Sequence, residues 1–162
     1  MDIRDHWPAI LRVLHASKRS TRHFSIATVT PNGQPHVTPI GHAFFREDMT
    51  GYYFDAYSQA MPVNLAHDPR ICLMAVTIST KLWLPALIKG QFNAPPGVRL
   101  FGEVSAARSA TQEEIAELAR SIRSTRALRG HKMLWGDLRR VRDIRFDAFA
   151  PVAYPKMCDG LW

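Results

Sequence analysis

The stretch that decides the fold runs from Tyr52 to Val76 and reads YYFDAYSQAMPVNLAHDPRICLMAV. Its pattern predicts a strand, a tight turn into one short helix, and a second strand that is apolar on both faces. Ser58 is the expected N-cap of the helix, and Asp68-Pro69 is expected to end it. Because a helix N-terminus presents free N–H donors and a partial positive charge, this junction is suited to hold a phosphate. An ordinary strand-helix-strand corner would show the same pattern.

The composition is that of a globular chain. The chain has 162 residues, of which 46% are hydrophobic and 22% charged, so neither a disordered nor a fibrous class is favoured. We expect a single domain over residues 1–162, large enough to bury a core without cross-links. The two cysteines, Cys72 and Cys158, lie far apart, and Cys72 falls within an apolar run. They are therefore expected to be free thiols, and no metal site is expected.

The N-terminal residues carry scattered charges and have no apolar core. This excludes a signal peptide, and nowhere do about 18 apolar residues run together, as a membrane span would need. We therefore expect a cytoplasmic protein that has no membrane partner.

The net charge of +7 is unevenly distributed along the chain. Basic residues gather between Arg120 and Arg145, where only Asp137 and Asp143 oppose them. Such a segment attracts anions, which include nucleic acid, a phosphorylated cofactor, an acidic substrate and a partner subunit. Nucleic acid is the least expected, because the segment lacks alternating aromatic residues that would stack on bases. A merely solvated basic face would also explain the charge.

The N-terminal half predicts a helix followed by a hairpin. Apolar residues at helical spacing indicate an amphipathic helix over about residues 6–17, with Asp5 as its N-cap. The segments 23–30 and 34–45 then read as two strands joined by a turn with Asn-Gly at its centre. Pro39 and Gly41 lie inside the second strand. They indicate an edge strand, a bulge, or a planar ligand close to the backbone.

The second half predicts two more strands and a helix. Segment 80–97 has no clean period and contains three prolines, so we expect an irregular crossing with about one helical turn. Strands are expected at 98–106 and 142–154, and a capping box at Thr111 to Glu114 begins a helix. The whole chain is therefore expected to be mainly β, an antiparallel barrel or sheet with appended helices, the last of them in a basic segment at about 111–145.

The sequence carries no strong catalytic signature. It lacks a Gly-rich phosphate loop, a G-x-S-x-G motif, an H-E-x-x-H motif and a cysteine pair at metal spacing. His36 and His42 have even spacing on one expected strand, but further metal ligands are missing nearby, so we interpret them as polar lining or surface residues. No residue is identified as catalytic.

The first half of the chain resembles the flavin-binding split barrel of the pyridoxamine 5′-phosphate oxidase-like family. That family commonly shows an ATV-x-x-x-G-x-P-x-V-x-P hairpin, an aromatic strand ending near Ser or Thr, and N-L-x-x-x-P before an apolar strand. The matching residues here are Ala27-Thr28-Val29, Gly33, Pro35, Val37, Pro39, Phe54, Ser58, Asn64-Leu65 and Pro69.

The resemblance implies a homodimer that binds FMN at the subunit interface and acts on a small-molecule substrate or electron donor. The ring would lie against the second strand, and the phosphate near the start of the short helix. The expected cofactor-binding residues are His36, Val37, Thr38, Pro39, Ile40, Asp55, Ala56, Tyr57, Ser58, Gln59, Met61 and Arg70.

The chain departs from the family at the phosphate site. Many members carry Lys or Arg just before the Asn-Leu pair, where this chain has Met61. The leading hypothesis is a flavin-dependent oxidoreductase, in which the flavin performs the redox chemistry. The alternative is a non-catalytic protein that holds a flavin, a deazaflavin or haem, all of which relatives of this barrel accept.

Overall fold

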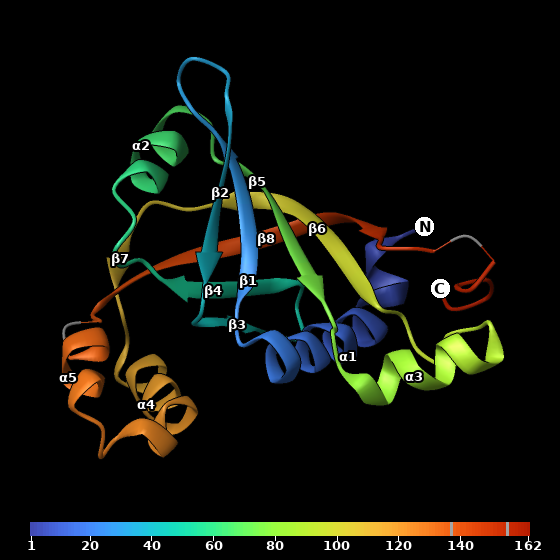
Figure 1. Cartoon of the computed structure of the whole chain (residues 1–162). Helices are drawn as coiled ribbons and strands as arrows, with labels where there is room; N and C mark the ends of the chain where they lie inside the picture. The colour runs from blue at the N-terminus through green and yellow to red at the C-terminus, as the bar shows by residue number, and fades with distance from the viewer. Residues whose placement is uncertain (137, 155) are drawn as a thin grey trace.

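The computed structural model describes residues 1–136, 138–154 and 156–162. An antiparallel sheet in the order β2-β1-β5-β6-β8-β4-β3, with β7 added beside β8, forms its centre. Figure 1 shows the sheet curling so that β3 and β4 cross beneath β1 and β2. The predicted antiparallel split barrel with appended helices is confirmed. The strands are β1 (Phe24–Val29), β2 (Pro35–Ile40), β3 (Ala43–Phe45), β4 (Thr50–Phe54), β5 (Arg70–Val76), β6 (Gly97–Val104), β7 (Arg108–Ser109) and β8 (Arg140–Pro151).

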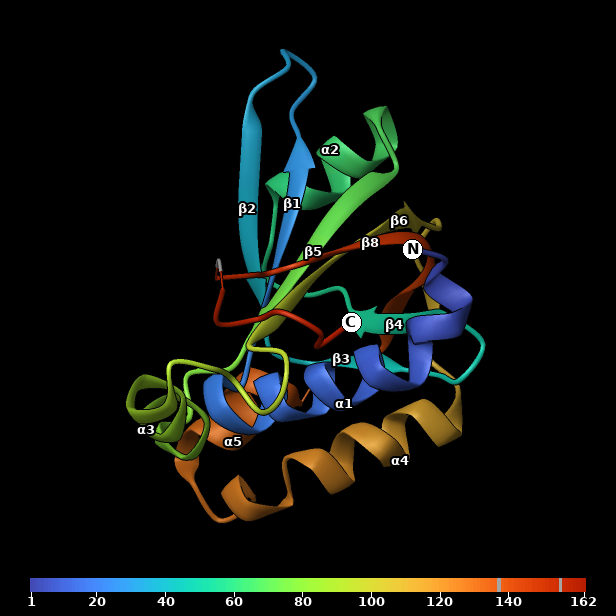
Figure 2. The same ribbon diagram turned by 90° about the vertical axis from the view of Figure 1, so that its right-hand side faces the viewer.

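The helices surround this half-barrel. They are α1 (Ile3–Thr21), α2 (Ala60–His67), α3 (Thr80–Lys89), α4 (Gln112–Ser121), the 3-10 turn η1 (Arg123–Thr125) and α5 (Arg129–Trp135). In Figure 2, α1 runs along the base of the curled sheet and α4 lies below it. The apolar stripe of α1 (Trp7, Ile10, Leu14) belongs to one buried cluster with Ile26 and Leu73 of the sheet. The main core therefore fills the space between α1 and the concave face of the sheet.

The first helix is longer than predicted. It spans Ile3 to Thr21. It begins at Ile3 because the Asp2 carboxylate, and not that of Asp5, accepts the capping hydrogen bond from the Arg4 N–H at 2.9 Å. Arg22 ends it in a left-handed conformation with φ 63°. The prediction of residues 6–17 was therefore wrong at both ends, although the buried face is the predicted one.

The predicted hairpin forms with β1 paired to β2 from Phe24–Ile40 to Val29–Pro35. The turn has Gly33 at φ 83°, a left-handed conformation that glycine adopts without strain. The expected return strand 34–45 is divided, because β2 ends at Ile40 and β3 begins at Ala43. As Pro39 indicated, β2 is an edge strand.

Segment 80–97 is more helical than predicted. It contains the ten-residue helix α3 with Pro85 inside it, whereas about one helical turn was expected. Leu84, Leu87 and Ile88 lie on the exposed side of the helix, so α3 carries apolar residues on more than one face. Its sequence therefore lacks the clear apolar period of an amphipathic helix.

The C-terminal half follows the predicted order with shifted ends. The capping box at Thr111 and Glu114 is present at the start of α4, and a 3-10 turn and α5 follow before the last strand. That strand, β8, pairs with β4, β6 and β7. Its register with β6 shifts at Gly102, where a Cβ atom would lie 2.1 Å from the Arg145 carbonyl oxygen. Both cysteines are free, as predicted, and Asp137 of the basic segment lies outside the described residues.

Candidate functional site

The start of α2 has the hydrogen bond that the sequence predicts. The Ser58 hydroxyl accepts from the Met61 backbone N–H at 3.1 Å, although Gln59 is the residue at the N-cap position. Asp68 ends the helix, and its N–H donates to the Asn64 carbonyl oxygen at 2.8 Å. Strand β4, the turn with Ser58, α2 and β5 therefore follow one another as predicted.

Asn64 fixes the position of α2 on the sheet. Its side chain is buried, and its amide Nδ2 donates to the Thr28 hydroxyl of β1 at 2.9 Å. The neighbouring Leu65 is part of the main core. The Asn-Leu pair thus has a physical role, because it holds the helix so that its N-terminus lies beside the edge strand β2.

A cavity of about 470 Å³ lies between β2 and the N-terminus of α2. We call it the β2–α2 cavity. It is lined by most of the predicted cofactor-binding residues, namely His36, Val37, Thr38, Pro39, Ile40, Ala56, Tyr57, Ser58 and Gln59. Residues that were not predicted complete the lining, namely Gly41, His42, Phe54, Ala60 and Leu138.

Three of the predicted residues lie outside this lining. The Asp55 carboxylate is buried against Arg142 at 2.7 Å. Met61 is fully buried, and its backbone N–H is held by Ser58. Arg70 stands beyond the other end of the eight-residue α2, a length of about 12 Å. There its exposed guanidinium pairs with Asp68 at 2.6 Å and lowers the pKa of that carboxyl to about 2.

Two buried polar atoms of β2 lack partners. His36 Nδ1 and Thr38 Oγ1 form no hydrogen bond with any part of the chain that the structure describes. Both residues pair across the hairpin with inward-facing positions of β1, so they point to the concave side of the sheet. A buried polar atom without a partner costs about 1–3 kcal/mol, so a bound molecule that satisfied both atoms would be stabilised there.

His42 is held in the neutral state at the rim of the cavity. The Trp135 indole N–H of α5 donates to His42 Nε2 at 2.6 Å, which leaves the ring proton on Nδ1. Burial, and then the nearby charge of Lys18, lower the pKa of His42. The ring also meets Trp135 edge-on, with centroids 5.7 Å apart. His42 therefore joins α5 to the β2–β3 connection.

Tyr57 is an exposed residue with an unusual backbone. Its φ is 68° and 73% of its surface is exposed, a conformation that costs a non-glycine residue about 1–3 kcal/mol. Its hydroxyl donates to the Leu134 carbonyl oxygen of α5. The turn before α2 and helix α5 thus meet at the cavity.

The cavity has no cationic side chain in its described lining. An anion there would contact the first-turn N–H groups of α2, the partial positive charge of the helix and the Ser58 hydroxyl. The described residues include no group of three or more His, Cys, Asp or Glu side chains placed to hold a metal ion. None of the described helices combines the length and apolarity that are required to cross a bilayer.

Local sequence patterns reveal only part of this lining. His42 continues the even spacing of His36 along the expected strand, and it was interpreted as polar lining, which is its place here. Leu138 and the contacts of Trp135 and Leu134 come from a segment about 80 to 100 positions away. No residue near β2 or α2 indicates them, because they depend on how α5 packs back onto the barrel.

Comparison with known proteins agrees with this architecture. An FMN-binding protein from Syntrophomonas wolfei superposes with a TM-score of 0.62 at 12% identity, covering 94% of this chain and 95% of that one. The haem storage protein HutZ from Vibrio cholerae superposes with a TM-score of 0.55 at 12% identity, covering 88% of this chain and 94% of that one. HupZ from Group A Streptococcus superposes with a TM-score of 0.57 at 13% identity, covering 88% of this chain and 92% of that one. At these identities the likeness concerns the fold alone.

A search of curated protein sequences finds no match to the chain. The family model described as pyridoxamine 5′-phosphate oxidase matches residues 12–145, from the first helix to the last strand. This range includes the hairpin, α2 and the whole described lining of the β2–α2 cavity. The chain therefore belongs to the pyridoxamine 5′-phosphate oxidase family.

Proposed function

We propose that this protein is a flavin-dependent oxidoreductase that binds FMN in the β2–α2 cavity. The observation that carries the proposal is the pair of unpartnered polar atoms, His36 Nδ1 and Thr38 Oγ1, in the lining of a cavity that ends at a helix N-terminus. Flat heteroaromatic rings with donors and acceptors along one edge suit such an edge strand, because its free N–H and C=O groups need partners. Family membership supports the same reading.

Each part of FMN has a matching group in the chain. The isoalloxazine ring would lie along β2, where Thr38 and His36 would offer hydrogen bonds to it. The phosphate would lie at the start of α2, near the Ser58 hydroxyl and the first-turn N–H groups. A bound flavin would supply two-electron redox chemistry by accepting a hydride. The chain would bind and orient it, and no side-chain acid or base is needed.

We further propose a homodimer formed through the convex face of the sheet. A row of apolar or small residues crosses that face in direct register, from Val37 through Ala27, Cys72 and Phe101 to Ala148. Val37 is 60% exposed and Phe101 is 37% exposed. Helix α1 packs on the other face of the sheet, so a second copy is the proposed cover for this row.

The runner-up function is storage or transport of a cofactor without turnover. The observation that favours it is the absence of a cationic side chain from the described lining, since a charge-assisted hydrogen bond to phosphate is about twice as strong as a neutral one. Haem, a flavin without the phosphate and a deazaflavin are the alternative ligands. The similarity in fold to a haem storage protein supports including haem.

An absorption spectrum of the purified protein separates these functions. Two bands typical of oxidised flavin, bleached by a nicotinamide donor, would support the oxidoreductase. A Soret band would instead support haem binding, and flavin bands that no nicotinamide donor bleaches would support storage.

The phosphate position is tested by comparing FMN with riboflavin, which lacks the phosphate. Ser58→Ala should weaken FMN binding about fivefold, the effect of one hydrogen bond of about 1 kcal/mol, and leave riboflavin binding unchanged. Arg70→Ala is the matched control, since Arg70 lies beyond the far end of α2. This variant should bind FMN and riboflavin as tightly as the wild type does. Equal dissociation constants of FMN for the wild type and Ser58→Ala would move the phosphate elsewhere.

A further inference from the structure

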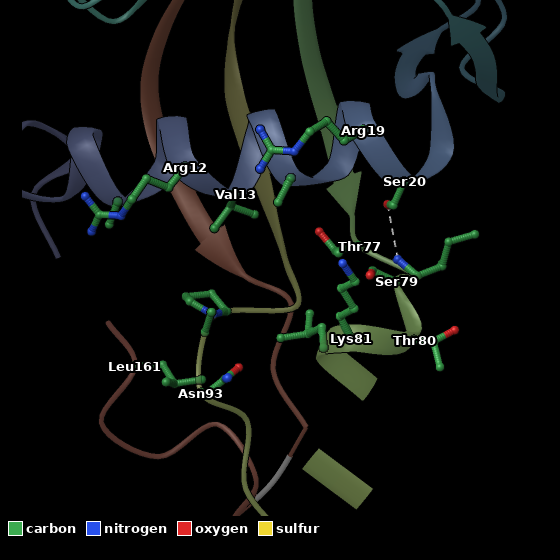
Figure 3. A pocket seen from close by; sticks show the side chains of 16 residues that line it. Arg12, Val13, Arg19, Ser20, Thr77, Ser79, Thr80, Lys81, Asn93 and Leu161 are labelled. Atoms are coloured by element: carbon green, nitrogen blue, oxygen red, sulfur yellow. Dashed lines mark hydrogen bonds between the residues drawn. The ribbon is translucent and has the colours of Figure 1, made fainter. Parts of the chain in front are cut away.

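A second, larger cavity lies on the other side of the molecule, between α1 and the start of α3. Its volume is about 750 Å³, within the range of small-molecule sites. We call it the α1–α3 cavity. Its walls are α1, the turn from Thr77 into α3, the loop before β6 and Leu161 near the C-terminus (Figure 3). The described linings of this cavity and of the β2–α2 cavity have no residue in common.

The lining of the α1–α3 cavity is cationic. Arg12 and Arg19 come from α1 and Lys81 from the first turn of α3, and the described lining contains no carboxylate. Within the described parts of the chain, none of these three cations forms an ion pair with an acidic residue. The lining therefore has three positive charges that are free to attract an anion.

A buried hydroxyl group at this site also lacks a partner. Thr77 is only 5% exposed, and its Oγ1 has no hydrogen-bond partner among the residues that the structure describes. Its backbone is fixed, because its N–H donates to the Pro96 carbonyl oxygen at 2.8 Å and its carbonyl oxygen accepts from the Trp83 indole N–H at 2.7 Å. Figure 3 shows the Thr77 hydroxyl directed toward α1, which forms one wall of the cavity, and the Lys81 side chain extending toward Thr77.

The start of α3 adds further donors at the same place. The N-cap residue Ser79 makes no capping hydrogen bond with its side chain, and the first turn contains no acidic residue. The helix therefore presents first-turn N–H groups and the positive end of its dipole. Lys81 in that turn opposes the dipole, an arrangement that an anion between the two would stabilise. The turn is held against α1, since the Ile78 N–H donates to the Ser20 hydroxyl at 3.3 Å.

The remaining lining is largely apolar, with Val13, Leu82, Pro95 and Leu161 among its residues. We propose that the α1–α3 cavity binds a small amphiphilic organic anion. Its carboxylate or phosphate head would lie beside Thr77, Lys81 and the first turn of α3, and its apolar body along α1. This site is independent of the proposed flavin site.

Calorimetric titration of the full chain with matched probes tests the proposal. Octanoate and octyl phosphate carry both a charged head and an apolar body, octan-1-ol lacks the charge, and inorganic phosphate lacks the apolar body. We expect saturable binding of one equivalent of octanoate or octyl phosphate, and the tighter of the two identifies the head group. Octan-1-ol and inorganic phosphate should bind at least about tenfold more weakly, the effect of losing one charge-assisted hydrogen bond. Equal binding of octan-1-ol and octanoate would overturn the proposal.

Variants of the lining locate the head group. Lys81→Gln should weaken binding of the preferred probe about tenfold, and Thr77→Val about fivefold, whereas Thr77→Ser keeps the hydroxyl and should bind as the wild type does. Lys89→Gln is the matched control, because Lys89 lies in the last turn of the same helix and does not line the cavity. If Lys81→Gln and Lys89→Gln had the same effect, or neither Lys81→Gln nor Thr77→Val had any, the specific site would be disproved.

Discussion

At the scale of single residues, His42 couples protonation to the packing of α5. Its folded pKa is lowered, so below about pH 6.5, the ordinary value for histidine, the unfolded chain takes up a proton that the folded chain resists. The free energy of unfolding should therefore fall as pH drops below that value, and level off below the folded pKa. Protonated Nε2 could no longer accept from Trp135.

Urea unfolding between pH 5 and 7.5 measures this dependence. His42→Gln keeps an acceptor for Trp135 but does not titrate, so its free energy of unfolding should change less over this range than that of the wild type. His15→Gln, at an exposed position on α1, should keep the wild-type dependence. Identical curves for the wild type and His42→Gln would show that His42 is not the titrating group.

Asn64 is predicted to act on both stability and cofactor binding. Asn64→Leu keeps the volume but removes the donor to Thr28, and it should cost about 2 kcal/mol of unfolding free energy. Because α2 would then be held less firmly, FMN affinity should also fall. Denaturant unfolding and FMN titration measure the two effects. Val63→Ala, at an exposed position of the same helix, should change stability by less than about 0.5 kcal/mol.

At the scale of elements, Arg108 of β7 joins α4 to β8. Its guanidinium donates to Glu114 at 2.7 Å and to Asp143 at 2.6 Å, and these bonds hold the pKa values of both carboxyls below their usual range. Arg108→Gln should lower the unfolding free energy at pH 7 by about 2 kcal/mol. Arg145→Gln removes a guanidinium from the exposed pair with Glu103, and should cost less than about 1 kcal/mol.

The pH dependence of the stability lost in Arg108→Gln gives a second test of these ion pairs. Carboxyls with lowered folded pKa values stabilise the fold above their unfolded pKa, about 4, and that contribution is lost as pH falls through the folded values. The stability difference between the wild type and Arg108→Gln should therefore be greatest at neutral pH and shrink below about pH 4. Thermal unfolding at several pH values would show it, and a constant difference would count against the ion pairs as its cause.

Elements with local signals were predictable from sequence. The hairpin turn, the capping box of α4 and the Asp68-Pro69 end of α2 each depend on residues within a few positions, and all three are confirmed. Helix α3 was missed because its apolar residues are spread around the helix and Pro85 suggested a break. Such a helix depends on tertiary packing, which no local period reports.

The lining of the β2–α2 cavity was likewise predictable only in part. Residues of β2 and of the turn before α2 were predicted, because a strand and a helix start that are close in sequence converge there. Leu138 and the Trp135 contact of His42 were not predictable, since they depend on how a distant segment returns to the barrel. The α1–α3 cavity was missed for the same reason, as its walls come from α1, from residues 77–82 and 93–95, and from Leu161.

At the scale of the whole molecule, the apolar row on the convex face predicts the assembly. Phe101→Glu places a charge within that row and should convert the proposed dimer to monomer at micromolar concentration, as measured by sedimentation velocity. Leu87→Glu adds the same charge to the exposed side of α3 and should leave the dimer intact. A monomeric wild type, or dissociation by Leu87→Glu alone, would contradict the proposed interface.

The position of β8 in the sheet has a consequence for synthesis of the chain. Among the described residues, β3 and β4 join the rest of the sheet only through β8, which is also the last described strand. A nascent chain on the ribosome can therefore form the β1-β2-β5-β6 part early, while the edge of β4 that β8 will cover stays open until Arg140–Pro151 emerges. During that interval Tyr53 and Phe54 lie on an unpaired edge, which is open to association with other chains or to chaperones.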